Sequence, residues 1–103
     1  EVGSVVDLPL ETWERVFRVN LTGCFLAMKH VIPVMQRQFE ETGEGGSIIN
    51  ISSIWGMVGH HYASPYCAAK AALLSLTRTA CAPGGRRRSS RRGGRRRSPA
   101  CCA

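Results

Sequence analysis

The sequence has no long hydrophobic run, and this absence is the first guide to its class. No uninterrupted apolar stretch approaches the ~20 residues that a membrane-spanning helix needs. The first residues also lack the basic start and apolar core of a secretory signal. We therefore expect a soluble, cytoplasmic protein with no membrane partner.

The cysteines form neither a disulfide pattern nor a metal-binding pattern. The five of them include no CxxC pair and no His/Cys ligand spacing, and Cys101 beside Cys102 is a poor start for a disulfide framework. His60 and His61 have no third ligand at a suitable spacing. We expect reduced thiols and no metal site.

The net charge of +7 is concentrated in one segment. Of the fourteen lysines and arginines, eight are arginines between Arg86 and Arg97, whereas residues 1–83 carry six basic and seven acidic groups. The basic surplus therefore does not indicate a nucleic-acid partner for residues 1–82. Residues 83–103 are rich in Arg, Gly and Ser and have no hydrophobic periodicity, so we expect a disordered tail.

Two successive helical segments are predicted in the first half of the chain. Apolar residues recur at spacings of three and four from Leu10 onward, so the first helix should begin near Pro9 or Leu10. The pattern continues to about Phe39, with a distortion expected at residues 20–23. Pro33 should bend or locally break the second segment, because proline lacks a backbone donor.

A strand and a further helix are predicted in the second half. The run Ile48–Ile51 is typical of a strand buried on both faces of a parallel sheet. Ser64 as the N-cap and Pro65 in the first turn predict a helix that runs to about Ala80. Helices alternating with a strand indicate an α/β fold, in which sites lie beyond the carboxyl ends of strands, where Ser53 stands.

Tyr66 and Lys70 are four residues apart on the last helix and should therefore share one face. An ammonium group near a phenol stabilises the phenolate, which helps a tyrosine to donate and accept protons at neutral pH. The pair alone is weak as a signal, because the spacing often arises by chance.

Three segments taken together resemble the short-chain dehydrogenase/reductase family. They are "VNLTG" from Val19, "GGSIINISS" ending at Ser53, and "YCAAKAAL" from Tyr66. The resemblance covers roughly Gly3 to Thr79. It implies part of a Rossmann-type, doubly wound parallel sheet and a homo-oligomeric oxidoreductase. The implied reaction is hydride transfer between NAD or NADP and a secondary alcohol or ketone.

The resemblance also implies a catalytic tetrad of Asn20, Ser53, Tyr66 and Lys70. In this assignment Tyr66 exchanges a proton with the substrate oxygen, and Ser53 binds and orients the same oxygen. Lys70 acts with Tyr66 to hold the nicotinamide ribose, and Asn20 supports a water that links Lys70 to solvent. We expect Ser52, by contrast, to be structural.

The loop before the last helix leaves two interpretations open. Trp55, Met57 and Tyr62 either contact an apolar substrate or only pack against the protein. We expect His60 and His61 to line the same substrate loop.

The sequence departs from the family pattern at both ends. The implied glycine-rich turn for the cofactor pyrophosphate is not present, so we expect an incomplete copy of the enzyme. After Ala82 the pattern should continue into another strand, but the arginine-rich segment follows instead. It is either a genuine phosphate-binding tail on a catalytically dead fragment or a coding sequence read in the wrong frame. We favour the second, because the break falls inside a helix-to-strand unit.

Overall fold

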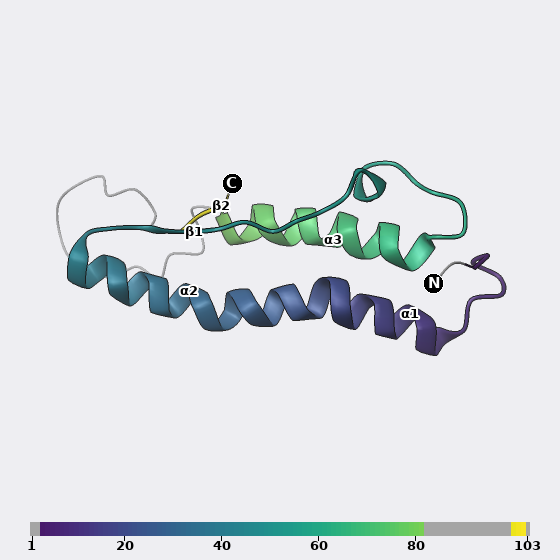
Figure 1. The fold of residues 1–103 in the computed structure, drawn as a ribbon, viewed down its shortest axis with the longest axis horizontal. Helices are drawn as coiled ribbons and strands as arrows, with labels where there is room; N and C mark the ends of the chain where they lie inside the picture. The colour runs from purple at the N-terminus through teal and green to yellow at the C-terminus, as the bar shows by residue number, and fades with distance from the viewer. Residues whose placement is uncertain (1–2, 82–99, 103) are drawn as a thin grey trace.

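A computed structural model describes residues 3–81 and 100–102 of the chain. In chain order the elements are helix α1 (Leu10–Phe17), π-helix η1 (Arg18–Thr22), helix α2 (Gly23–Thr42), strand β1 (Gly46–Ile48), 3-10 helix η2 (Ile54–Gly56), helix α3 (Ser64–Cys81) and strand β2 (Ala100–Cys102). Elements α1, η1 and α2 form one continuous helical rod, and an extended segment returns along it to the start of α3 (Figure 1). Helix α3 then runs in the same direction as the rod, as in an α/β unit.

The helical rod follows the sequence prediction closely. It begins at Leu10, directly after Pro9 in an extended conformation, and it ends at Gly43, whose φ of 75° is left-handed. The predicted distortion is confirmed as η1, where the Gly23 N–H bonds to the Arg18 carbonyl five residues earlier. The predicted local break at Pro33 is wrong, because α2 continues through it. Met28 and Met35, which lie on either side of Pro33, are both buried.

The strand lies earlier in the chain than predicted. We expected Ile48–Ile51, but β1 covers Gly46–Ile48, where it pairs in parallel with β2. The register pairs Gly46 with Ala100 and Ile48 with Cys102. Strand β1 therefore ends at Ile48, opposite the last residue of β2. The expected burial on both faces is also wrong, since Ile49 and Ile51 are 70% and 78% exposed.

Strand β2 corrects the expectation of a tail without regular structure at Ala100–Cys102. The edge of β1 offers backbone N–H and C=O groups, and any extended segment can pair with them whatever its side-chain pattern. The rest of the predicted tail, residues 83–99 and Ala103, lies outside the described residues.

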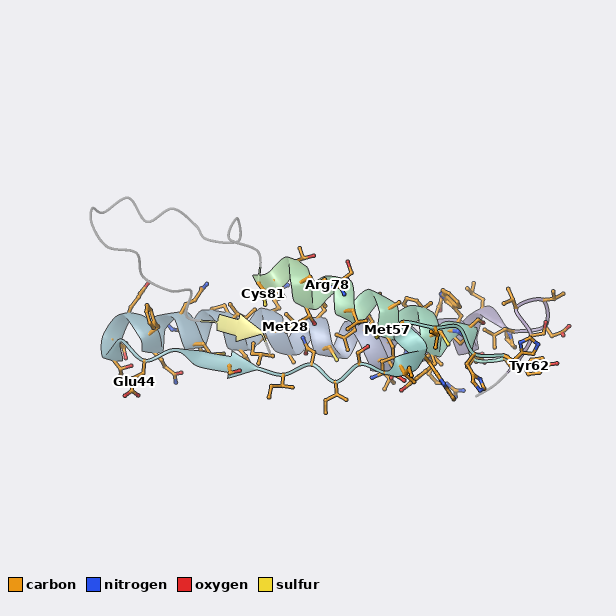
Figure 2. The ribbon with its side chains drawn as sticks, turned by 90° about the horizontal axis from the view of Figure 1, so that it is seen from above. Met28, Glu44, Met57, Tyr62, Arg78 and Cys81 are labelled. Atoms are coloured by element: carbon orange, nitrogen blue, oxygen red, sulfur yellow. The ribbon has the colours of Figure 1, made fainter. Side chains whose placement is uncertain are left out.

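The core lies between the rod and α3. Ala69 and Leu73 of α3 are fully buried, and Met28 of α2 is 4% exposed. The Asn50 amide donates to Thr77 Oγ1 at 3.0 Å and to Met28 Sδ at 3.3 Å, so the extended segment contacts both α3 and α2. Figure 2 shows this segment beside the helices, between Glu44 at one end and Tyr62 at the other.

Helix α3 begins at Ser64, as predicted, but Ser64 is not its N-cap. It is the first helical residue, and its buried Oγ has no hydrogen-bond partner. Ala63 stands before it, and the Ala63 carbonyl accepts the Cys67 N–H at 2.9 Å. Ala63 therefore occupies the N-cap position, because its carbonyl accepts this first helical bond, and its methyl side chain cannot accept a backbone N–H.

Candidate active site

A cavity of about 600 Å³ opens where the rod, η2 and the start of α3 meet. Helix α3 contacts η1 and η2 at this point. The residues that line the cavity are Val16, Asn20, Ser53, Ile54, Trp55, Ala63 and Tyr66. Three members of the proposed tetrad, Asn20, Ser53 and Tyr66, therefore surround one space although they come from distant parts of the sequence.

Lys70 lies close to Tyr66 on α3 but is not among the residues that line the cavity. Its Nζ is 5.5 Å from the centroid of the Tyr66 ring, which confirms the prediction that both side chains share one face of α3. The ammonium group also donates to the Ile51 carbonyl at 3.0 Å. This bond connects the lysine to the extended segment immediately before Ser53.

Ser52 fixes the backbone of the same helical turn. Its Oγ donates to the Lys70 carbonyl at 2.9 Å, in agreement with the structural role that we expected. Two neighbouring residues, Ile51 and Ser52, thus bind the side chain and the backbone of Lys70. These two bonds join the end of the extended segment to α3.

Ser53 has an extended backbone and stands directly before η2. Its Oγ accepts the Trp55 backbone N–H at 3.2 Å. Because a serine hydroxyl has one O–H donor and two acceptor lone pairs, this bond leaves the O–H able to donate into the cavity. Ser53 is therefore suited to bind a carbonyl or hydroxyl oxygen beside Tyr66.

Asn20 reaches the cavity from the π-helical turn. Its Nδ2 donates to the Val16 carbonyl at 3.0 Å, and its own backbone carbonyl accepts Cys24 Sγ at 3.6 Å. A π-helical turn displaces a residue from the regular helical position, and such turns often occur at functional sites. Asn20 and Lys70 approach the Tyr66 region from different elements.

Gly56 contributes to the site in a way that the sequence did not reveal. A Cβ atom on Gly56 would lie 2.8 Å from the Lys70 carbonyl carbon and 3.0 Å from the Ala71 nitrogen. Only glycine therefore allows η2 to pack this closely on the turn of α3 that holds Lys70. The glycine is visible in the sequence, but its neighbour is known only from the fold.

The loop residues form an aromatic cluster beside the cavity. The Trp55 and His60 rings stack at 3.9 Å, and the Trp55 and Tyr66 rings meet edge to face at 5.9 Å. Met57 is 79% exposed and does not line the cavity. Trp55 therefore approaches the site, whereas the other two residues of the open alternative, Met57 and Tyr62, are not among its lining residues.

Two negative findings apply to the part of the chain that the structure describes. No helix there is long and apolar enough to span a bilayer. No group of three or more His, Cys, Asp or Glu side chains there could hold a metal ion.

Comparison with known proteins identifies the family. The sequence model described as short chain dehydrogenase matches residues 1–88. The chain belongs to this family. It is 46% identical over 77 residues to trans-4-hydroxycyclohexanecarboxylate dehydrogenase of Sinomonas cyclohexanicum, covering 75% of this chain and 27% of the relative. The chain therefore spans about a third or less of the length of such relatives.

The names of other relatives include both a dehydrogenase and an inactive dehydrogenase. A 3-alpha-(or 20-beta)-hydroxysteroid dehydrogenase of Mycobacterium tuberculosis is 41% identical over 87 residues, covering 82% of this chain and 32% of the relative. A protein of Xanthobacter autotrophicus named inactive 2-(S)-hydroxypropyl-CoM dehydrogenase 2 is 43% identical over 76 residues, covering 74% of this chain and 31% of the relative. Similarity at this level thus includes a protein described as inactive.

A solved structure supports the same fold for this family member. The acetoin dehydrogenase YohF from Salmonella typhimurium has a TM-score of 0.72 and 36% sequence identity, covering 79% of this chain and 32% of that chain. The fold class predicted from the sequence, part of a Rossmann-type α/β sheet, is confirmed by this likeness.

Proposed function

We propose that this chain carries the catalytic segment of an NAD(P)-dependent oxidoreductase that interconverts a secondary alcohol and a ketone. The observation that carries the proposal is the convergence of Ser53 and Tyr66 on one cavity, with the Lys70 ammonium 5.5 Å from the Tyr66 ring. The dehydrogenase names of the relatives support the same reaction class.

In the proposed mechanism, the Tyr66 hydroxyl exchanges a proton with the substrate oxygen as general acid or base. The Ser53 O–H donates to the same oxygen and stabilises the charge that develops on it. Lys70 is cationic beside the phenol, and Asn20 supports a water on the path by which the proton reaches solvent. NAD or NADP, when bound, supplies the acceptor or donor of the hydride.

The residues present fit one end of that cofactor. Lys70 has three N–H donors and gives one to the Ile51 carbonyl, so it can still bind ribose hydroxyls together with Tyr66. Within residues 3–81 the glycines before β1 precede a strand and do not begin a helix. We therefore assign only the nicotinamide ribose to this segment, and the choice between NAD and NADP depends on residues elsewhere.

We also propose a cytoplasmic location and a homo-oligomer for the complete protein. Support for close subunit packing comes from the small residues on α3, of which Ala71 is exposed. Ala69, in contrast, is buried within the chain. Light scattering coupled to size-exclusion chromatography would measure the oligomeric state.

An inactive protein is the second candidate, because one relative is named as such. A chimaera separates the two candidates. Residues 3–81 replace the matching segment of the Salmonella typhimurium acetoin dehydrogenase, whose other segments supply the rest of the fold. Acetoin oxidation by the chimaera, with the parent enzyme as reference, would support an active site in this segment.

In an active chimaera, Tyr66→Phe should lower kcat by about 10²-fold or more, the usual range for loss of a positioned proton donor. Ser53→Ala should lower it by ~10² to 10³. Met57→Ala is the control, because this exposed side chain lies outside the cavity. A near-normal rate for Tyr66→Phe would show that the family resemblance stands for the fold alone.

A further inference from the structure

Trp55 contacts two residues of the proposed active site, Tyr66 through its indole and Ser53 through its backbone. It lines the cavity, its ring meets the Tyr66 ring at 5.9 Å and 86°, and its backbone N–H donates to Ser53 Oγ. The side chain is 37% exposed, so part of its surface remains available to a ligand. Trp55 is thus the large apolar side chain held beside both groups that bind the substrate oxygen.

His60 supports the indole from outside the cavity. The two rings stack with centroids 3.9 Å apart and an interplanar angle of 24°. His60 Nδ1 lies 2.8 Å from the His61 carbonyl, which fixes the imidazole plane when Nδ1 carries the proton. His60 does not line the cavity, so any effect on a ligand must pass through Trp55.

The cavity separates polar from apolar surface. Hydrogen-bonding side chains come from Asn20, Ser53 and Tyr66, and the remaining lining residues are Val16, Ile54, Trp55 and Ala63. No lining residue has a charged side chain. This arrangement suits a ligand with one hydroxyl or carbonyl oxygen and an uncharged hydrocarbon body, because the lining offers no charged partner to replace the water that an ionic group would lose.

A cyclic hydrocarbon body suits this space for two reasons. The planar indole of Trp55 offers a flat apolar wall, and a rigid ring loses less conformational freedom on binding than a flexible chain does. We propose that Trp55 is the specificity-determining residue of the cavity and selects an uncharged alicyclic alcohol or ketone. His60 is a positioning residue that acts by holding the indole. The inference rests on the proposed function for the oxygen-bearing group, but binding can be measured without cofactor or turnover.

The test measures binding of cyclohexanone to the 103-residue chain by ligand-observed NMR. Saturable binding is expected, and Trp55→Ala should weaken it by about tenfold, since a buried aromatic contact contributes on this scale. Met57→Ala, in the same loop but outside the cavity, should leave the affinity unchanged. Absence of saturable binding, or equal affinity for Trp55→Ala, would overturn the inference. If Trp55→Ala fails to fold, Trp55→Leu replaces it, with a loss of about threefold expected and an unchanged affinity overturning the inference.

Ligand charge and ring support are tested separately. The carboxylate analogue 4-oxocyclohexanecarboxylate should bind at least tenfold more weakly than cyclohexanone, and equal or tighter binding would overturn the uncharged class. His60→Ala should weaken cyclohexanone binding about threefold, and His60→Phe should restore it because a phenyl ring can still stack. In a Trp13→Phe background, where Trp55 is the remaining tryptophan, His60→Ala should also change the fluorescence emission. No rescue by His60→Phe would refute the positioning role.

Failure of this inference and failure of the proposed function are distinguishable. An unchanged cyclohexanone affinity for Trp55→Ala concerns equilibrium binding to the chain itself. A normal rate for Tyr66→Phe concerns proton transfer in the chimaera, and neither result implies the other.

Discussion

Two parts of this chain use their apolar residues in opposite ways. Where α3 meets η2 and the rod, Ala69 and Leu73 are completely buried, and the polar groups of Ser52 and Lys70 are hydrogen-bonded. In the extended segment after β1, Ile49 and Ile51 are largely exposed. The described residues therefore bury apolar side chains of α3 but leave those of the extended segment largely uncovered.

In the first region, Ser52 and Ile51 bond to Lys70 across 18 and 19 positions of the chain. Asn20 reaches the same site from the rod, so the site also depends on the packing of α3 against η1. The second region is a strand-like run of the kind that parallel sheets cover on both faces. Its burial needs neighbours that the described residues do not provide.

The largest expected effect on stability is at Leu73. Leu73→Ala removes a fully buried side chain and should lower the free energy of unfolding by about 2–5 kcal/mol. Ile51→Ala removes an exposed side chain and should change it by less than about 0.5 kcal/mol. Urea denaturation followed by circular dichroism measures both. Similar losses for the two variants would mean that the contrast does not exist in solution.

A smaller loss is expected at the close approach of η2 to α3. Gly56→Ala places a methyl group 2.8 Å from the Lys70 backbone, and overpacking of this kind costs about 1–3 kcal/mol. The matched control is Gly59→Ala, because no atom lies within 4 Å of the Cβ position there. If the two variants unfold at the same urea concentration, η2 does not pack on α3 as closely as described.

The next effect concerns the hydrogen bond from Ser52 to α3. Ser52→Ala removes the donor to the Lys70 carbonyl and should cost about 1 kcal/mol. Ser52→Thr keeps a hydroxyl and should retain most of the stability. Chemical denaturation of the three proteins gives the comparison, and equal stability of all three would show that the bond is without consequence.

The local sequence pattern predicted where the helices of this chain lie better than it predicted which residues are buried. The start of the rod, the distortion at η1 and helix α3 follow from spacing, from Pro9 and Pro65, and from family resemblance. The strand was misplaced because the position of a short ladder depends on its partner, and β2 at Ala100–Cys102 has no strand pattern of its own.

The sequence predicted which residues make up the candidate site but not the contacts that hold them in place. Tyr66 and Lys70 share a face because helical spacing requires it. The bond from Lys70 to Ile51, the stacking of Trp55 on His60 and the close approach at Gly56 join residues whose separation has no fixed period. Such contacts become visible only when the loop is placed against α3.

The smallest effect on folding is expected where the apolar residues are exposed. The double variant Ile49→Thr with Ile51→Thr keeps two β-branched residues and should leave the free energy of unfolding within about 0.5 kcal/mol. It should nevertheless reduce self-association, so that the chain stays monomeric up to a higher concentration. The reason is that an exposed apolar strand next to a sheet edge favours association. Light scattering against concentration measures this, with Val19→Thr as a control for one exposed apolar residue on η1. A destabilisation of the double variant by more than about 1 kcal/mol would mean that Ile49 and Ile51 are buried in solution, and the contrast between the two regions would then be lost.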